Sequence, residues 1–194
     1  MYPNIGRQGK LMRRIVVSDI FGKTPELAKL CKALSGDVVV IDPYAGANMN
    51  FQAEEQAYAF FMANMGLNTY SDLLRSRLER IPPPATLIGF SVGASAVWQI
   101  SESLNAEKVK RAICFYGSQI RHLTEVNPSI MVEYVLPMYE PGFSVEELAS
   151  RLSGKKNVVI HETQYLHGFM NELSRNFNES GYTRYIDWLR RSAV

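Results

Sequence analysis

Short apolar runs, rich in β-branched residues, alternate along the chain with longer amphipathic stretches. The runs lie at residues 15–18, 38–41, 86–90, 111–116, 134–138 and 157–160. Each is almost continuously apolar, which is typical of strands that are buried on both faces of a parallel sheet. The pattern therefore predicts a mostly parallel sheet of about six to seven strands.

The stretches between these runs carry helix signals. Residues 24–26, Thr-Pro-Glu, supply an N-cap, a proline at the first helical position and an acid in the first turn, and Gly36 ends that helix. Residues 144–147, Ser-Val-Glu-Glu, form a capping box, and residues 182–191 form a last amphipathic helix. Strand and helix alternate over nearly the whole chain, which predicts an α/β fold with a doubly wound sheet flanked by helices. Ligands bind such sheets at the carboxyl ends of the strands.

One stretch, residues 46–80, contains no strand candidate and is rich in aromatic residues and methionine. Its spacing predicts two helices, at residues 53–64 and 70–80. We expect their aromatic residues to pack against the sheet, with a lid or the wall of an apolar pocket as the alternative. The whole chain, residues 1–194, is then one domain.

Composition narrows the class of protein. The 194 residues are 46% hydrophobic and 21% charged with a net charge of +2, which excludes a disordered chain and gives no basic surface for nucleic acid. Two cysteines form neither a disulfide framework nor a zinc motif, and no apolar run is long enough to span a membrane. Residues 1–14 are polar and basic without the apolar stretch of a signal peptide. We expect a cytoplasmic protein, monomeric or homodimeric, that needs no metal or cofactor.

The most informative motif is a nucleophile elbow. Residues 89–93, Gly-Phe-Ser-Val-Gly, match G-x-S-x-G, directly after a predicted strand and directly before a predicted helix. That order places the serine on a sharp turn above the sheet, and the flanking glycines avoid collisions there. A tight turn with an N-capping serine is the structural alternative, but the context favours Ser91 as a nucleophile.

A serine nucleophile needs a base, and the chain has three histidines. His122 lies in a polar loop and is expected to be solvated, whereas His161 directly follows a predicted strand. His167 lies on the loop after the last strand, where a triad in this fold places its histidine. We therefore predict that His167 is the base for Ser91.

The triad acid should follow the strand between the serine and the histidine. Glu140 comes just after the run at 134–138 and is the predicted acid. Glu146 and Glu147 are rivals, but they fall in the first turn of a helix, where acids are favoured by the helix dipole alone.

The oxyanion needs two N–H donors. One is expected from Val92, the residue after the serine, and the other from Ile20, in the loop after the first strand. In that loop Asp19 and Phe21 are expected to contribute to a substrate pocket, with a simple turn-forming role as the alternative for Asp19.

Several segments together resemble the dienelactone hydrolase family of α/β-hydrolases. They lie in the family's order at residues 18–22, 42–46, 89–93, 113–117, 140–145 and 167–171. The resemblance implies an α/β-hydrolase fold, a cysteine–histidine–aspartate triad and an acid beside the oxyanion loop. In this chain serine stands at 91, glutamate at 140 and aspartate at 19, so the resemblance is to a serine variant of the family. No arginine matches the family's carboxylate-binding positions.

These observations predict a serine hydrolase that cleaves a small carboxylic ester or lactone through an acyl-enzyme. One alternative is a thioesterase or lysophospholipase, with an apolar pocket built from Phe51, Phe60, Phe61 and Met65. Another is a non-catalytic protein of the same fold that binds a ligand or partner. Because few residues remain beyond the sheet and its covering helices, we expect an open, shallow site.

Overall fold

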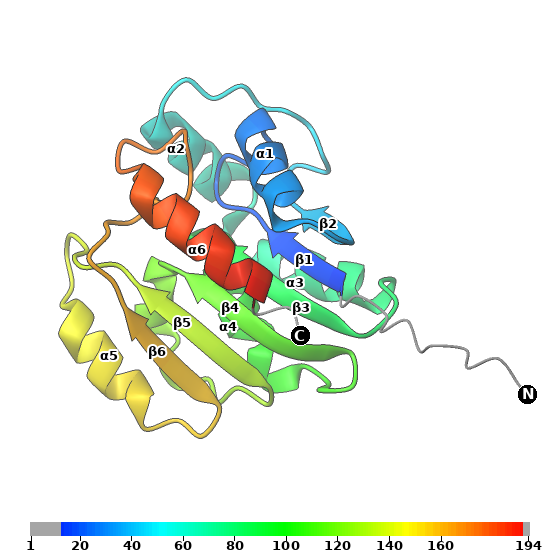
Figure 1. Cartoon of the computed structure of the whole chain (residues 1–194), viewed down its shortest axis with the longest axis vertical. Helices are drawn as coiled ribbons and strands as arrows, with labels where there is room; N and C mark the ends of the chain where they lie inside the picture. The colour runs from blue at the N-terminus through cyan, green and yellow to red at the C-terminus, as the bar shows by residue number, and fades with distance from the viewer. Residues whose placement is uncertain (1–12, 192–194) are drawn as a thin grey trace, which may run out of the picture.

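Six parallel strands form the centre of the molecule (Figure 1), in a computed structural model that describes residues 13–191. The strands are β1 (Arg13–Val17), β2 (Val38–Ile41), β3 (Ala85–Phe90), β4 (Val109–Phe115), β5 (Met131–Leu136) and β6 (Val158–Glu162). They lie in the order β2-β1-β3-β4-β5-β6, and every neighbouring pair is parallel. The predicted parallel sheet is confirmed, with six strands in the described part of the chain.

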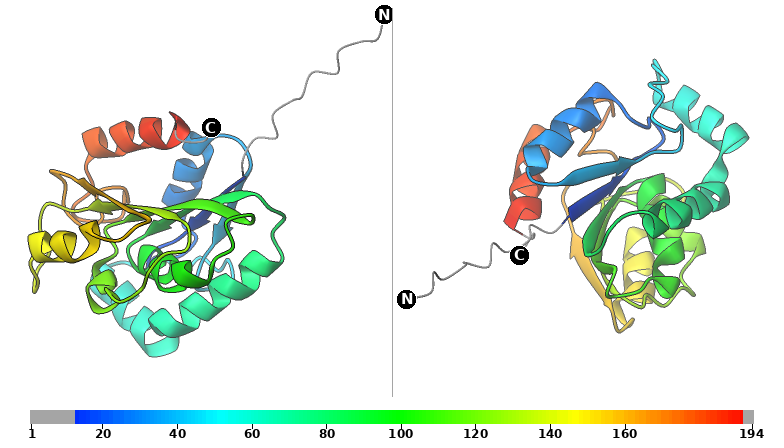
Figure 2. Two further views of the ribbon diagram at one scale, coloured as in Figure 1. Left: turned by 90° about the horizontal axis from the view of Figure 1, so that it is seen from below. Right: turned by 90° about the vertical axis from the view of Figure 1, so that its right-hand side faces the viewer.

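Helices cover both faces of the sheet. On one face lie α1 (Pro25–Leu34) and α6 (Glu179–Arg191). The other face carries α3 (Gly66–Glu79), α4 (Val92–Ile100) and α5 (Val145–Ser153), as the two views of Figure 2 show. Thr24 caps α1 through its hydroxyl, and Ser144 caps α5 in the same way, as their sequences predict. The sheet is therefore doubly wound.

Residues 46–80 form two helices, α2 (Glu54–Asn64) and α3, which begins at Gly66 rather than at the predicted residue 70. Phe61 and Tyr70 are fully buried in the core, which agrees with packing against the sheet. Tyr58 and Met62 of α2 remain exposed. The outer helix therefore keeps one face free, beside the carboxyl ends of the strands.

Several predicted strand boundaries differ from the structure by one to three residues, and two of these differences bear on polar residues of the sheet. Strand β5 begins at Met131 rather than at residue 134, and His161 lies inside β6 rather than after it. The polar residue Glu133 interrupts the apolar run of β5, and the polar residue His161 does the same near the end of β6. The Glu133 carboxylate pairs with Arg111 at 3.3 Å and with His161 at 2.8 Å, and these neighbours compensate its charge.

The order of the strands determines where a ligand can bind. After β1 the chain moves outward to β2, and it then returns to the other side of β1 to form β3. Crossovers therefore leave the sheet on opposite sides at β1 and β3, and such a switch point opens a crevice at the carboxyl ends. The loops after β1 and β3 begin at Ser18 and Ser91.

The sequence predicts no signal peptide in residues 1–14. Residues 1–12 of this segment lie outside the described residues. Within residues 13–191, no helix combines the length and the apolar character needed to cross a membrane.

Phe115, at the end of β4, is the centre of an aromatic cluster between the sheet and α6. It is fully buried and contacts the rings of Phe90, Phe169, Tyr185 and Trp188 at centroid distances of 5.1–6.4 Å. Truncation to alanine would leave a cavity with no side chain able to fill it. We expect Phe115→Ala to lower the free energy of unfolding by about 3–5 kcal/mol in urea titrations. Val159→Ala, on an exposed side chain, is the control, and equal effects of the two would contradict this packing.

Candidate active site

Ser91 occupies a strained turn between β3 and α4. Its φ is +51° and its ψ is −116°, in a region that residues with a side chain rarely adopt. The Ser91 N–H donates to the carbonyl of Phe115 at 3.0 Å, which ties the turn to β4. The backbone of the turn is thus bound to the sheet, and Ser91 lines a cavity.

Glycine is required at position 93 because α4 starts almost in contact with the end of β1. A Cβ atom there would lie 2.3 Å from the carbonyl oxygen of Ser18 and 2.4 Å from that of Val17. Both are backbone atoms that cannot swing away. This close approach brings the loop after β1 next to the turn that carries Ser91.

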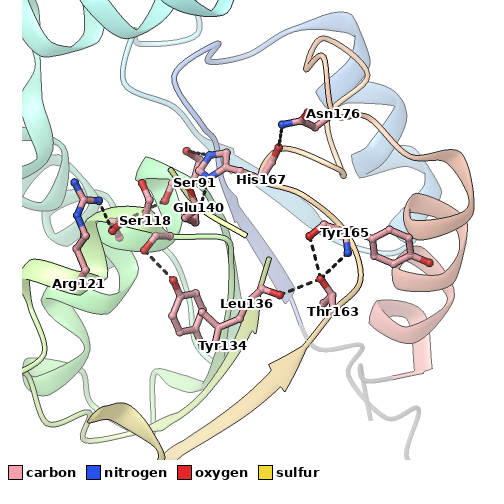
Figure 3. A network of polar contacts seen from close by, with 12 residues as sticks. Ser91, Ser118, Arg121, Tyr134, Leu136, Glu140, Thr163, Tyr165, His167 and Asn176 are labelled. Carbon is pink, nitrogen blue, oxygen red and sulfur yellow. Dashed lines mark hydrogen bonds and ion pairs between the residues drawn. The ribbon is translucent and has the colours of Figure 1, made fainter. Parts of the chain in front are cut away.

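His167 lies on the long loop between β6 and α6, and its Nε2 is 2.9 Å from Ser91 Oγ (Figure 3). The Asn176 side-chain amide donates to the His167 carbonyl at 2.9 Å, and the Tyr116 ring lies 5.0 Å from the imidazole. The histidine is therefore held from the backbone and from one face of its ring.

Glu140, in the loop after β5, accepts from the other nitrogen of the same imidazole. Its Oε1 is 2.6 Å from His167 Nδ1, and only 5% of the residue is exposed. The two loops are joined beyond the ends of their strands: Thr163 Oγ1 donates to the Leu136 carbonyl at 2.9 Å, and the Met138 N–H donates to the Tyr165 carbonyl at 2.7 Å. Figure 3 shows part of this connection below Glu140.

The structure thus brings Ser91, His167 and Glu140 together in one chain of hydrogen bonds, and it leaves their rivals elsewhere. His161 pairs with Glu133 inside the sheet, and His122 is exposed on the short 3₁₀ helix η2 (Ser118–His122). Glu146 and Glu147 lie in the first turn of α5, on the helix that Ser144 caps.

Two backbone N–H groups are candidates for an oxyanion site. Val92 is the first residue of α4, so its N–H has no partner within the helix. Ile20 lies in the loop after β1, and its N–H has no acceptor among residues 13–191. Both residues line the same cavity as Ser91. Two unpaired donors beside the serine hydroxyl are what a developing oxyanion requires.

The cavity beside Ser91 has a volume of about 490 Å³, within the usual range for small-molecule sites. Most of the residues in its wall are of polar type, although the surface that they present to the cavity is largely apolar. They are Ile20, Glu54, Glu55, Tyr58, Ser91, Val92, Ser118, Gln119, Glu140, Pro141, His167, Arg175 and Asn176. Tyr58 belongs to the 46–80 stretch for which a pocket wall is the alternative expectation, whereas no sequence pattern marks Arg175. Arg175 pairs with Glu55, and its Nε is 3.8 Å from Glu54. These residues connect α2 to the histidine loop across one side of the cavity.

Phe51, Phe60, Phe61 and Met65 do not line this cavity. Phe51 and Phe60 pack with Tyr44, at centroid distances of 5.8 and 5.7 Å, and Phe61 is buried in the core. These four residues therefore do not form the apolar pocket of the alternative function beside the serine.

Asp19 and Phe21 are also absent from the wall of the cavity. The Asp19 carboxylate accepts from the Phe21 N–H of its own loop at 3.0 Å and from Asn171 Nδ2 of the histidine loop at 2.6 Å. Removal from water raises the pKa of Asp19 to about 6, and both hydrogen bonds act in the opposite direction. Phe21 lines a separate hollow near Phe51.

In the described part of the chain, no group of three or more histidine, cysteine, aspartate or glutamate residues is arranged to hold a metal ion.

Comparisons with known proteins place this geometry in context. No family model matches the chain. A search of curated proteins finds the uncharacterized protein YczH of Bacillus subtilis, which is 27% identical over 186 residues, covering 92% of this chain and 91% of that protein.

Solved structures of similar fold include a cold-adapted esterase from an Arctic intertidal metagenomic library (17% identity, TM-score 0.63, 96% of this chain and 85% of that one). Another is a monoacylglycerol lipase of Paleococcus ferrophilus (11%, 0.64, 92% and 94%). A third is a lipase-esterase related protein of Clostridium acetobutylicum (13%, 0.62, 93% and 95%). At these identities the likeness concerns the fold, and it confirms that the chain has the α/β-hydrolase fold.

Gly93 and Gly154 form a matched pair for testing the close approach at the serine turn. An added Cβ would meet two carbonyls at Gly93, whereas no atom lies within 4 Å at Gly154. We expect Gly93→Ala to lower the free energy of unfolding by about 2 kcal/mol or more and Gly154→Ala to change it by under about 1 kcal/mol. Equal values from chemical denaturation of the two variants would contradict the contact.

Asp19 should make stability depend on pH. Its pKa in the folded protein, about 6, lies above the ordinary value of 3.8, so the folded state binds this proton more tightly. The stabilisation is complete below the ordinary pKa and is lost as the pH rises through the folded pKa.

Asp19→Asn removes this titration. The free energy of unfolding of the wild type, relative to that of the variant, should therefore fall as the pH is raised from about 4 to about 7. Denaturation at a series of pH values measures it, with Asp72→Asn on an exposed side chain as the control. A difference that rises with pH would show that the sign is wrong.

Proposed function

We propose that this α/β-hydrolase-fold chain is a serine hydrolase that cleaves a small carboxylic ester or lactone through an acyl-enzyme. The observation that carries the proposal is the continuous chain of hydrogen bonds from Ser91 through His167 to Glu140. Ser91 and His167 line the same cavity as Ile20 and Val92, the two residues with unpaired N–H donors. A serine hydroxyl, an imidazole and a buried carboxylate in this order are the requirements of a catalytic triad.

In the proposed first step His167 Nε2 takes the proton of Ser91 Oγ while this oxygen attacks the ester carbonyl. Glu140 holds the imidazole with Nε2 toward the serine and stabilises the imidazolium that forms. The N–H groups of Ile20 and Val92 donate to the carbonyl oxygen as it becomes an oxyanion. The tetrahedral intermediate collapses when His167 returns the proton to the leaving alcohol.

In the second step water replaces the alcohol. His167 takes a proton from the water, whose oxygen attacks the acyl carbon, and a second tetrahedral intermediate forms in the same oxyanion site. Its collapse releases the carboxylic acid and returns the proton to Ser91. For a lactone, alcohol and acid remain joined in one product.

The wall of the cavity supports small acyl groups rather than long chains. Of the aromatic residues of the 46–65 region, only Tyr58 lines the cavity, and the charged residues Glu54, Glu55 and Arg175 share its wall. Arg175 is the one cation in that wall, and it is already paired with Glu55. The resemblance to dienelactone hydrolases supports ester or lactone cleavage, whereas the paired arginine argues against a dienelactone carboxylate as the preferred substrate.

Removal of the nucleophile or of the triad acid should abolish or strongly reduce catalysis. We expect Ser91→Ala to abolish labelling by a serine-reactive phosphonate, and Glu140→Gln to reduce kcat for p-nitrophenyl acetate by about 10²-fold or more. Ser153→Ala and Glu147→Gln, both on α5, are the matched controls and should leave labelling and kcat unchanged.

A folded wild type that takes up no phosphonate would overturn the proposal and leave a non-catalytic binding protein. A panel of p-nitrophenyl esters of increasing chain length accompanies this test. A clear preference for long chains would favour a thioesterase or lysophospholipase instead.

A further inference from the structure

Hydrogen bonds fix the peptide units on both sides of Ile20, the central residue of the loop after β1. The peptide unit that carries the Ile20 N–H has the Asp19 carbonyl at its other end. This carbonyl accepts from the Gly22 N–H at 3.1 Å and from the Ser18 hydroxyl at 3.2 Å. The plane of the first peptide unit is therefore fixed by its own loop, and its N–H is left unpaired.

The next peptide unit is held by two side chains. The Tyr44 hydroxyl donates to the Ile20 carbonyl at 2.7 Å, and the Phe21 N–H of the same unit donates to Asp19 Oδ1 at 3.0 Å. Tyr44 comes from the turn after β2, not from the loop itself. Rotation of this peptide would break both bonds, so Tyr44 and Asp19 together fix the backbone on the C-terminal side of Ile20.

Tyr44 is itself held in place. Its N–H donates to Asp42 Oδ1 at 2.8 Å, and its ring lies over Gly22, where an added Cβ would come within 2.6 Å. Gly22 has a φ of +74°, so the ring and the backbone conformation both require glycine there.

The second oxygen of Asp19 connects this loop to the histidine loop. Asp19 Oδ2 accepts from Asn171 Nδ2 at 2.6 Å, and Asn171 lies four residues after His167. The side chains of Asp19 and Asn171 thus join the loop after β1 to the histidine loop. A short bond to a carboxylate is stronger than a bond between neutral groups.

We propose that Asp19 and Tyr44 are positioning residues that aim the Ile20 N–H at the substrate carbonyl oxygen, and that Asn171 keeps this donor in register with His167. The inference rests on the proposed function, because an aimed N–H matters only if an oxyanion forms beside it. Neither side chain lines the cavity, so both act through the Ile20 backbone.

Positioning of an oxyanion donor has a specific kinetic signature. The oxyanion exists in the transition state and not in the bound ester, so a misaligned donor lowers kcat and leaves KM nearly unchanged. For Tyr44→Phe, which removes one hydroxyl, we expect kcat to fall about 5- to 30-fold with KM changed by less than about twofold. Tyr182→Phe, on α6, is the matched control.

Inhibition by a transition-state analogue provides a second test of the positioning role. A trifluoromethyl ketone forms a tetrahedral adduct with Ser91 and places an oxyanion in the same site. Its inhibition constant should rise by the same factor by which kcat/KM falls in each variant. A variant that is merely less stable would bind the ketone normally at a temperature where it is folded.

The hydrogen bond between Asp19 and Asn171 is tested by exchanging the carboxylate and the amide. Asp19→Asn places two amide groups against each other, and we expect a loss in kcat of about 10-fold or more. The double variant Asp19→Asn/Asn171→Asp restores one donor and one acceptor and should recover much of that loss. If Asp19→Asn does not fold, Tyr44→Phe and Asn171→Ser carry the test.

Hydrogen exchange of the segment 18–23, followed by mass spectrometry, tests the loop independently of activity. Faster exchange in Tyr44→Phe and Asp19→Asn than in the wild type is expected, because the bonds that fix the loop are gone. If the wild type is inactive, the proposed function fails, while exchange still decides whether these side chains hold the loop.

Unchanged exchange in both variants, or an active wild type whose kcat Tyr44→Phe and Asp19→Asn leave within about twofold, would overturn the inference. A fall in kcat that is matched by an equal rise in KM would also overturn it, because that result indicates a role in substrate binding.

Discussion

The contact between the start of α4 and the end of β1 is the constraint on which the site depends. With no side chain at Gly93, α4 begins within van der Waals reach of the Ser18 and Val17 carbonyls. This contact places the loop that carries Ile20 beside the loop that carries Ser91, at the switch point of the sheet. The strain at Ser91, with a φ of +51°, persists because β1, β4 and α4 hold the turn from three directions. Without this approach the two unpaired N–H groups could not face one cavity.

The remaining members of the site are brought in by cross-links between loops. The bonds from Thr163 to Leu136 and from Met138 to Tyr165 join the loops after β5 and β6, which places Glu140 against His167. Asp19 and Asn171 then join the histidine loop to the loop after β1. Three loops, each anchored at the end of a parallel strand, thus form one connected polar network, and its open side is the cavity bounded by α2.

Much of the fold and the placing of Ser91, His167 and Glu140 could be predicted because the information is local. A buried parallel strand is visible as an apolar run, and the elbow needs its glycines at fixed spacing on either side of the serine. Chain order alone then selects His167 and Glu140 from their rivals, once the strands are assigned. The start of β5 could not be predicted because Glu133 is a charged residue inside the strand. Its partners Arg111 and His161 lie on neighbouring strands, which the local sequence does not show. The roles of Tyr44, Asn171 and Arg175 depend on contacts between segments far apart in the chain, and no local pattern marks them.

The central claim is that Ser91 carries the acyl group during turnover. The most direct measurement is acid quenching of the protein during hydrolysis of p-nitrophenyl acetate, followed by mass spectrometry of its peptides. The account predicts an acetyl group on the peptide that contains Ser91, absent from Ser91→Ala and present at a higher steady level when deacylation is slowed. Turnover of the ester with no covalent adduct, or an adduct on any other residue, would contradict it.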